Sequence, residues 1–305
     1  MASDSALSLS YRYFAAVAEA GSVRGASRGV NVAASAISRQ LIQLEHVLGV
    51  QLFERHGRLM RLSPAGELLL KGLRATERSH EETLAELDAL KGLARGSVRI
   101  ATVESVSQAI LPALVTQFTA AYPGVQLAIT VAGSDAVSEM VRDHHADLGF
   151  TFNPTSREGL SVDYERKFQM GAIVAPGHQL AKRKSLTVAE CLDHPVAWPA
   201  RGLSLRVIVD RALGRRKQTA QHLVECNSLR LMASLAREGQ CVAFQTRIGI
   251  EADLAAKRLV FIPLTDRALP PDRLMIVRRP ALSKPSAAMV FLGIAKSHMQ
   301  KLALD

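Results

Sequence analysis

The feature that most constrains the fold is a change in the spacing of apolar residues near residue 95. Before it, apolar residues recur at spacings of three and four, the period of helices that pack on one face. Ala94-Arg95-Gly96-Ser97 reads as a linker, and after it short apolar runs alternate with helical segments. This change of pattern predicts a helical N-terminal domain, here called the head, followed by an α/β half with largely parallel sheets.

The first 62 residues predict three short helices and a hairpin. Gly21 ends the first helix, and Ser22 is a good N-cap for the second because its hydroxyl can accept a free backbone N–H. Gly49 ends the third helix, whose apolar face is formed by Ala34, Ile37, Leu41, Leu44 and Leu48. Two helices joined by a short turn and followed by a hairpin form the pattern of a winged helix-turn-helix.

The third helix carries polar side chains on its outer surface. Hydroxyl, amide and guanidinium groups suit base edges and the phosphates beside them. The candidate DNA contacts on this helix are Ser35, Ser38, Arg39, Gln40 and Gln43, and the hairpin adds Arg55, Arg58 and Arg61. A protein-binding winged helix, or a small solvated helical domain, is the alternative reading of the same pattern.

The charge balance favours an anionic partner. The chain has 38 basic and 28 acidic residues, a net charge of +10, so double-stranded DNA is the leading candidate. We find no uninterrupted apolar run of 18 residues and no basic start followed by an apolar stretch, so we expect a cytoplasmic protein without a membrane span. Cys191, Cys226 and Cys241 are not spaced as a disulfide framework or a metal knuckle, and we expect no metal and no cofactor.

A long helix is predicted over residues 64–93. Its seam has apolar and small polar residues at spacings of three and four, namely Leu69, Leu73, Thr76, His80, Thr83, Leu87 and Leu90. A single helix of this length cannot bury such a seam alone, so we expect it to pair with the same helix of a second chain. Packing on its own domain is the alternative.

The second half predicts alternating strands and helices. Apolar runs predict strands at 98–103, 125–132, 147–152, 171–175, 196–198, 241–245, 259–264 and 274–277. Helices are predicted at 108–122, 136–143, 205–213, 229–238 and 287–301.

Several motifs, in their order and spacing, resemble the LysR-type transcriptional regulators. In the head they are Ser22-Val23, Ala36-Ile37-Ser38-Arg39-Gln40-Leu41, Leu44-Glu45, Leu48-Gly49-Val50-Gln51-Leu52-Phe53-Glu54-Arg55 and Leu62-Ser63-Pro64-Ala65-Gly66. In the second half they are Tyr122-Pro123-Gly124-Val125, Ala146-Asp147-Leu148-Gly149-Phe150 and the stretch from Asn227-Ser228-Leu229 to Gly239.

The resemblance implies a regulator of three parts. Residues 1–63 would form the winged helix-turn-helix DNA-binding domain, and residues 64–93 the dimerising linker helix. Residues 94–305 would form a two-lobed effector-binding domain of the type 2 periplasmic-binding-protein kind, with lobe I at 97–171 and 268–305 and lobe II at 172–267. The implied partners are operator DNA, a small-molecule effector, further copies of the chain in a homodimer or homotetramer, and RNA polymerase as an additional candidate.

Some positions depart from the family pattern. Ala33 cannot cap the third helix with its side chain, which costs about 0.5–2 kcal/mol where a cap is missing. Ala34 cannot hydrogen-bond to a base edge, although it can touch a thymine methyl group. Gly25 and Gly29 each cost about 1 kcal/mol relative to Ala inside the second helix. We expect them to permit a close approach to its neighbour; the alternative is that they only soften the helix.

The effector is expected in a cleft between the lobes, at the carboxyl ends of strands. The candidates are small polar or acidic residues at predicted strand ends: Thr102, Glu104, Ser105, Ser134, Asp135, Thr151, Asn153, Ser204, Asn227, Ser228, Gln245 and Thr246. Each can also serve as a helix cap or turn residue. Glu104 and Asp135 suit an amine, whereas helix N-termini, Arg201 and Arg206 suit a carboxylate. The residues therefore leave cationic, zwitterionic and carboxylate ligands open, and we expect a small polar metabolite.

Two other functions fit the sequence less well. An enzyme with an accessory head would need a catalytic motif, and the chain has no Walker loop, GxSxG, HExxH or GxGxxG after a strand, so we expect no enzyme. A solute-binding protein would not carry the helical head. The pair His144-His145 is not expected to bind metal, because adjacent helical residues point about 100° apart.

Overall fold

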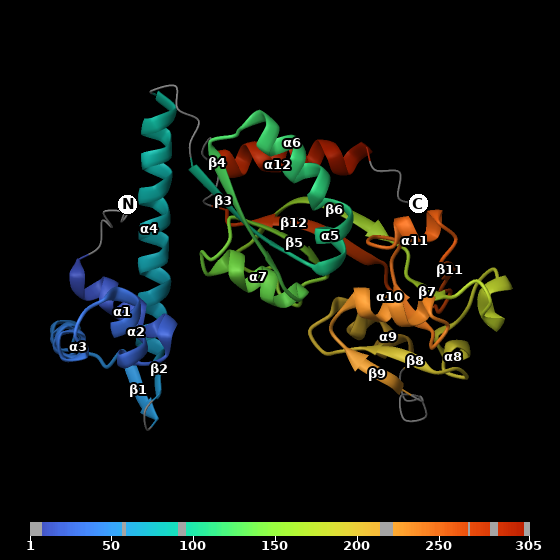
Figure 1. Cartoon of the computed structure of the whole chain (residues 1–305), viewed down its shortest axis with the longest axis horizontal. Helices are drawn as coiled ribbons and strands as arrows, with labels where there is room; N and C mark the ends of the chain where they lie inside the picture. The colour runs from blue at the N-terminus through green and yellow to red at the C-terminus, as the bar shows by residue number, and fades with distance from the viewer. Residues whose placement is uncertain are drawn as a thin grey trace. The chain divides into compact units, whose positions relative to one another are not determined.

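A computed structural model describes residues 8–56, 59–90, 96–213, 222–267, 269–280 and 286–301. The chain forms two compact units, Met1–Leu87 and Asp88–Asp305 (Figure 1). Within the described ranges, no helix is both long and apolar enough to cross a membrane.

The first unit is a winged helix-turn-helix followed by a long helix, as the sequence predicts. Its elements are α1 (Leu9–Ala20), α2 (Val23–Val30), α3 (Ala34–Leu48), β1 (Phe53–His56), β2 (Leu59–Leu62) and α4 (Pro64–Leu90). The strands β1 and β2 pair antiparallel, with Phe53 opposite Leu62. The core of this unit includes Phe14, Val17 and Ile37, which are fully buried.

Local signals explain where these helices begin and end. Gly21 and Gly49 adopt left-handed backbone conformations after α1 and α3. The Ser22 hydroxyl accepts a hydrogen bond from the Gly25 N–H at 3.1 Å, whereas Ala33 offers α3 no side-chain cap. The expectation that Leu48 belongs to the buried face of α3 is wrong: it is 38% exposed, because the end of the helix extends past the core.

The two glycines of α2 differ in their surroundings. A Cβ atom at Gly25 would lie 2.9 Å from the Ser22 Oγ and 3.0 Å from the Ala20 Cβ, so the expected close approach exists there. A Cβ at Gly29 would meet no atom of the described residues within 4 Å, and the expectation is wrong at that position.

The start of α4 is tied to the hairpin. The Ser63 hydroxyl donates to the Gln51 carbonyl at 2.6 Å and accepts from the Gly66 N–H at 3.0 Å. A Cβ at Gly66 would lie only 2.1 Å from the Leu52 carbonyl oxygen, so this position requires glycine. The Ser-Pro-Ala-Gly motif therefore sets the distance between the hairpin and the long helix.

Among the seam residues of α4 whose side chains the structure describes, burial is greatest near the first turns. Leu73 is buried and Leu69 is partly buried against the core of the head, whereas Leu84 and Leu87 are each 48% exposed. Leu84 and Leu87 thus present apolar side chains to solvent in the single chain.

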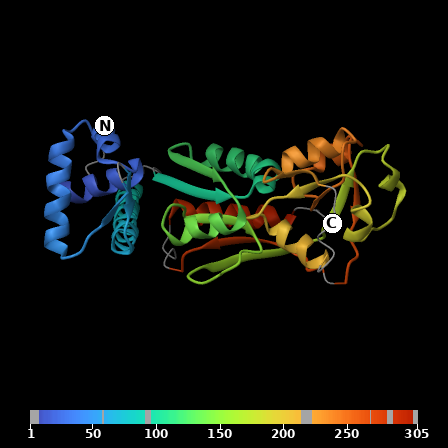
Figure 2. The ribbon, with the colours of Figure 1, turned by 90° about the horizontal axis from the view of Figure 1, so that it is seen from below.

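The second unit has two lobes, side by side in Figures 1 and 2. Lobe I is a five-stranded sheet of order β4-β3-β5-β12-β6, with β3 parallel to β4 and β5 and with β12 antiparallel to β5 and β6. Helices α6 and α12 cover one face of the sheet and α7 the other (Figure 1). The lobe I elements are β3 (Gly96–Thr102), α5 (Glu104–Ala109), α6 (Leu111–Ala121), β4 (Val125–Val131), α7 (Ser134–Arg142), β5 (Leu148–Phe152), β6 (Ser161–Phe168), β12 (Asp272–Arg278) and α12 (Ala287–Lys301).

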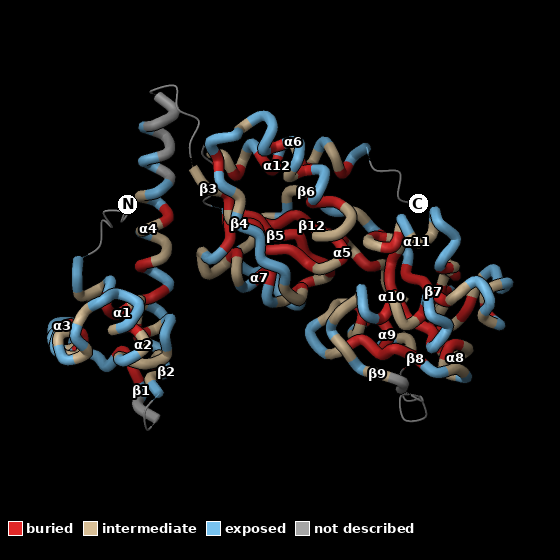
Figure 3. The backbone as a smooth tube through the Cα atoms, in the orientation of Figure 1, coloured by how far each residue is buried: buried red, intermediate tan, exposed pale blue. Residues whose placement is uncertain are grey.

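Lobe II contains a three-stranded sheet β10-β7-β11 and a parallel pair β8-β9. Its elements are β7 (Gly171–Val174), η1 (Gln179–Lys182), α8 (Val188–Cys191), β8 (Val196–Pro199), α9 (Ser204–Leu213), β9 (His222–Cys226), α10 (Leu229–Arg237), β10 (Ala243–Gln245), α11 (Glu251–Ala255) and β11 (Val260–Pro263). Each lobe has its own hydrophobic core, and Figure 3 shows the buried residues gathered in the strands and the helix faces on them.

The expectation of largely parallel sheets is wrong. Strand β12 runs antiparallel to both of its neighbours, and β7 pairs antiparallel with β10 and β11. The reason lies in the chain path: β6 and β7 carry it out of lobe I, and β11 and β12 bring it back, so β12 enters the lobe I sheet in the reverse direction.

Gly66→Ala should destabilise the head. Its Cβ would overlap the Leu52 carbonyl, and we expect overpacking to cost about 1–3 kcal/mol in the free energy of unfolding. Gly72→Ala is the matched control, because it lies on the same helix with no described atom within 4 Å and should stabilise the helix by up to about 1 kcal/mol. Urea unfolding of both variants measures the difference, and equal midpoints would contradict the assigned role of Gly66.

Candidate functional site

The outer face of α3 presents three of the expected DNA-contacting side chains in one row. Ser35, Arg39 and Gln43 are exposed and lie four residues apart, so they share a face of the helix. Ser38 and Gln40 beside the row are partly buried. Arg61 is exposed on β2, opposite Glu54. The side chain of Arg55, and all of Arg58, lie outside the described residues.

The charge of this face is not cancelled by α3 itself. The helix has one acidic residue, Glu45. Its carboxylate accepts hydrogen bonds from the backbone N–H groups of Leu52, at 2.7 Å, and Phe53, at 3.3 Å. The carboxylate thereby holds the chain that leads into the hairpin, and Arg39 gives the outer row of α3 a positive charge.

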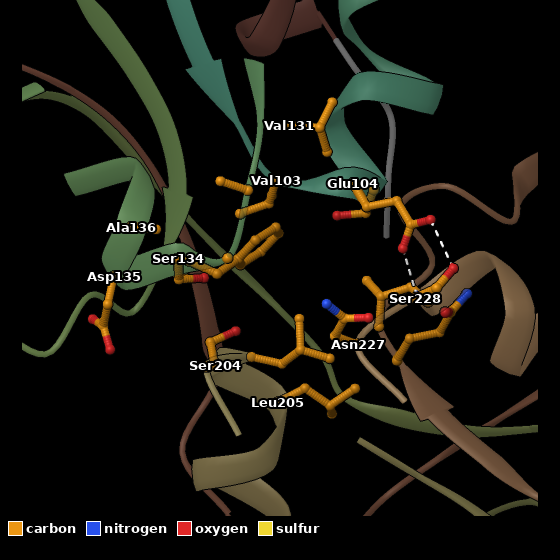
Figure 4. Close-up of a pocket in the computed structure, with 18 of the residues that line it drawn as sticks. Val103, Glu104, Val131, Ser134, Asp135, Ala136, Ser204, Leu205, Asn227 and Ser228 are labelled. Atoms are coloured by element: carbon orange, nitrogen blue, oxygen red, sulfur yellow. Dashed lines mark hydrogen bonds between the residues drawn. The ribbon is translucent and has the colours of Figure 1, made fainter. Parts of the chain in front are cut away.

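A cavity of about 600 Å³ lies between the two lobes of the second unit. Figure 4 shows side chains from both lobes around it, with Ser134 on lobe I and Ser204 and Asn227 on lobe II. Nine of the twelve expected effector-site residues line it: Glu104, Ser105, Ser134, Asp135, Ser204, Asn227, Ser228, Gln245 and Thr246. The rule that strand ends face the cleft therefore locates most of this site.

Three expected residues do not line the cavity. Thr102 and Thr151 are fully buried at strand ends, and the Thr151 hydroxyl donates to the Ser134 carbonyl at 2.8 Å. Because successive strand residues point to opposite faces, their neighbours Val103 and Phe152 line the cavity instead. Asn153 supports the wall, since its amide donates to a carboxylate oxygen of Asp272 at 2.8 Å.

Glu104 joins the two lobes across the cleft. Its Oε1 accepts a hydrogen bond from the Ser228 hydroxyl at 3.0 Å, and its Oε2 accepts one from the Leu229 N–H (Figure 4). The carboxylate of lobe I thus lies at the N-terminus of α10 in lobe II, where free backbone N–H groups and the helix dipole favour a negative charge. With a longer hydrogen bond from the Arg230 N–H to Oε2 at 3.4 Å, these charge-assisted contacts connect the two lobes.

Asp272 is a cavity residue that the sequence reasoning missed. It is 5% exposed, and its Oδ1 accepts hydrogen bonds from Asn153 of lobe I at 2.8 Å and from Ser204 of lobe II at 3.3 Å. Burial raises the pKa of this carboxyl to about 7, against the lowering effect of the two hydrogen bonds. The antiparallel direction of β12 explains the omission, because its amino end lies at the edge where the parallel strands have their carboxyl ends.

The other charged residues near the cleft differ in their hydrogen-bond partners and in their exposure. Both carboxylate oxygens of Asp135 accept hydrogen bonds from Thr155, through its N–H at 2.7 Å and its hydroxyl at 3.0 Å. Arg206, considered above as a carboxylate ligand, does not line the cavity: it pairs with Asp210 at 3.1 Å and donates to the Pro199 carbonyl at 3.0 Å. Arg201 does line the cavity, and it is exposed.

Gln245 lines the cavity, and two glycines lie where the lobes approach each other closely. The Gln245 side chain lines the cavity and is 4% exposed, and its Oε1 is buried without a hydrogen-bond partner among the described residues. A Cβ at Gly133 of lobe I would lie 2.8 Å from the Gly202 carbonyl of lobe II, and one at Gly249 would lie 3.2 Å from the Ser105 Cα. The lobes therefore approach each other closely at two places.

The described residues contain no group of three or more His, Cys, Asp or Glu side chains suited to a metal ion. The three cysteines are free thiols, of which Cys191 and Cys241 are buried. Burial raises the pKa of Cys191 to about 12 and that of Cys241 to about 11, which keeps both in the unreactive thiol form at neutral pH.

Comparison with known families agrees with this geometry. Residues 10–67 match the bacterial regulatory helix-turn-helix protein domain of the lysR family, and residues 91–300 match the LysR substrate binding domain. The chain belongs to the LysR family. The resemblance and the fold class expected from the sequence are thereby confirmed.

Named relatives of this LysR regulator are themselves regulators. It is 27% identical over 265 residues to the HTH-type transcriptional regulator CbbR of Rhodospirillum rubrum, covering 87% of this chain and 88% of that protein. It is 28% identical to a probable nitrogen assimilation transcriptional activator of Synechococcus elongatus, covering 88% of each. The regulator is therefore a DNA-binding transcription factor with an effector-binding domain, and not an enzyme.

Solved structures share its fold. A full-length single-residue variant of OxyR from Pseudomonas aeruginosa superposes with a TM-score of 0.67 at 16% identity, covering 98% of this chain and 96% of that one. Full-length CbnR in complex with its target DNA superposes with a TM-score of 0.62 at 19% identity, covering 96% and 98%.

Glu104→Gln should weaken the closed arrangement of the lobes. The substitution keeps the shape of the side chain and removes the negative charge at the α10 N-terminus, so we expect a loss of about 1–3 kcal/mol in the free energy of unfolding. Small-angle scattering of the unliganded protein should show a larger radius of gyration. Glu139→Gln, on the exposed face of α7, is the control. Identical stability and scattering for both variants would show that the Glu104 hydrogen bonds, here called the Glu104 bridge, do not hold the lobes together.

Asp272 makes the stability of the second unit depend on pH. Its folded pKa of about 7 lies above the unfolded value of about 4, so the folded chain holds a proton that the unfolded chain has released. The stabilisation of the fold by this bound proton is complete below about pH 4 and is lost as the pH rises through about 7. Asp272→Asn should therefore gain stability relative to the wild type between pH 5 and pH 8, by an amount on the order of a few kcal/mol. Thermal unfolding curves measure this, with the exposed Asp193→Asn as control; a constant wild-type-to-variant difference would contradict the raised pKa.

Proposed function

We propose that this LysR regulator reads its operator through the outer row of α3 and the hairpin. The residues assigned to DNA are Ser35, Ser38, Arg39, Gln40, Gln43, Arg55, Arg58 and Arg61. The observation that carries the assignment is the exposed row Ser35, Arg39 and Gln43 on a helix whose single acidic residue is engaged by the chain before the hairpin. Hydroxyl and amide groups can read base edges, and guanidinium groups can contact phosphates.

Each part of the chain is assigned one function. We assign residues 1–63 to DNA binding, 64–93 to dimerisation, and 94–305 to effector binding, with lobe II spanning 172–267 between the two parts of lobe I. A DNA-binding regulator of a bacterial family would act in the cytoplasm, where its operator lies.

Dimerisation is supported by the apolar surface of α4. Leu87, on the seam expected to face a second helix, is half exposed, and so is Leu84, three residues before it. Burial of such a seam between two chains would give a homodimer, and contacts between further copies would give the homotetramer.

The cleft between the lobes is the proposed effector site. It offers a volume suited to a small metabolite, with polar groups from both lobes around it. An effector switches a regulator only if it binds two assembly states with different affinity. A ligand that competes with or supports the Glu104 bridge would have that property, because the bridge connects the lobes.

Arg39→Ala tests the DNA assignment. A duplex selected from a randomised library by the wild-type protein serves as the probe, and gel-shift titrations at several salt concentrations measure affinity. We expect a loss of about tenfold or more, and a salt dependence whose slope falls by about one if Arg39 contacts a phosphate.

Arg267→Ala is the matched control, because Arg267 is an exposed arginine of the other unit. It should leave both the affinity and the salt slope near the wild-type values. Unchanged binding by the Arg39 variant, with the selected duplex still bound specifically by the wild type, would remove Arg39 from the interface.

A further inference from the structure

We propose that the effector carries a protonated amine or guanidinium group, which Asp272 and the Gln245 side-chain oxygen accept inside the cleft. This inference rests on the proposed function, because it takes the cleft between the lobes as the effector site. It selects one of the three ligand classes that the sequence leaves open.

Two helix N-termini at the cleft, those of α10 and α7, already carry carboxylates of the chain itself. Glu104 lies on the free N–H groups at the start of α10. Asp135 lies in the first turn of α7, where a negative charge meets the dipole of that helix. A carboxylate ligand at α10 would have to displace Glu104, and one near α7 would meet the charge of Asp135.

The basic residues do not favour an anion either. Among the described residues that line the cavity, Arg201 is the one basic side chain, and it is exposed. Arg206 is held outside the cavity by Asp210 and Glu225. A buried carboxylate ligand would therefore find acidic neighbours and no buried counter-ion among the described residues, which is unfavourable in a site of low polarity.

The surroundings of Asp272 suit a cationic partner instead. It is buried at the point where the chain returns to lobe I, and in the described part of the chain it forms no ion pair. Its neighbours Asn153 and Ser204 both donate to Oδ1, and no donor from the described residues reaches Oδ2. A ligand amine at Oδ2 would supply the missing charge and favour the ionised form of the carboxyl.

Gln245 gives an independent indication of a donor on the ligand. Gln245 lines the same cavity, and its buried Oε1 has no partner among the protein groups that the structure describes. A buried amide oxygen without a hydrogen bond is costly, and a ligand N–H group in the cleft would satisfy it. Asp272 and Gln245 come from different lobes, so a ligand that reaches both would also hold the lobes together.

Calorimetric titration of the full-length protein tests the ligand class. The probes are a panel of small primary amines, diamines and guanidines, including 1,4-diaminobutane and agmatine, and carboxylic acids of matched size, including succinate. We expect saturable binding of at least one amine or guanidine and none of the acids. Saturable binding of acids alone, or no binding of any amine or guanidine, overturns the proposal.

Three variants show whether the bound amine uses the assigned groups. Asp272→Asn keeps the shape and both neighbouring hydrogen bonds but loses the charge, and should weaken amine binding about tenfold or more. Gln245→Met removes the acceptor oxygen and should weaken binding severalfold. Asp193→Asn, an exposed carboxylate outside the cavity, should bind amines as the wild type does.

The outcomes separate this inference from the proposed function. Binding of acids at the cleft, abolished by Glu104→Gln or Asp272→Asn, would keep the cleft as the effector site and refute the amine. Amine binding that all three variants leave unchanged would place the amine elsewhere and refute the site. The gel-shift result for Arg39→Ala reports on the DNA assignment in either case.

Discussion

The chain of the second unit passes between its lobes at two places, from β6 to β7 and from β11 to β12. These two passages let the lobes close on a cavity while each keeps a separate hydrophobic core. They also determine which groups meet at the cavity. The passage from β11 to β12 places Asp272 where Asn153 of one lobe and Ser204 of the other both donate to its carboxylate. One buried acid therefore forms hydrogen bonds with both lobes.

The closed form of the cleft depends on electrostatics within the chain. Glu104 occupies the N-terminus of α10, so the bridge between the lobes is a carboxylate on a helix dipole and not an apolar contact. Close approaches at Gly133 and Gly249, where side chains would collide, allow the bridge to form. A ligand in this cavity changes the balance of charges among groups that already join the lobes, and binding and lobe closure are therefore coupled.

Local sequence signals made most of the helices predictable. The pairing of strands that are distant in the sequence could not be predicted from such signals. Caps, glycine stops and helical spacing placed α1 to α4 and α12 within a few residues of their bounds. Strand β6 was missed because Asp163, Glu165 and Lys167 interrupt any apolar run, and its pairing with β12 is visible only in three dimensions. Most of the residues chosen at strand ends do line the cavity. Asp272 was missed because its strand runs in the opposite direction, and Thr102 and Thr151 were misplaced by the alternation of side chains along a strand.

The junction between the hairpin and α4 explains how the head can respond to its long helix. Ser63 bonds both to Gln51, before the hairpin, and to Gly66, in the first turn of α4. Gly66 lies against the Leu52 carbonyl too closely for any side chain, and Glu45 of α3 accepts hydrogen bonds from Leu52 and Phe53. The start of α4, the hairpin and α3 are thus connected by short contacts with little room to slide. A rotation of α4 in a dimer would therefore carry the hairpin and the outer row of α3 with it, which is the movement that a change in spacing between two DNA-binding heads requires.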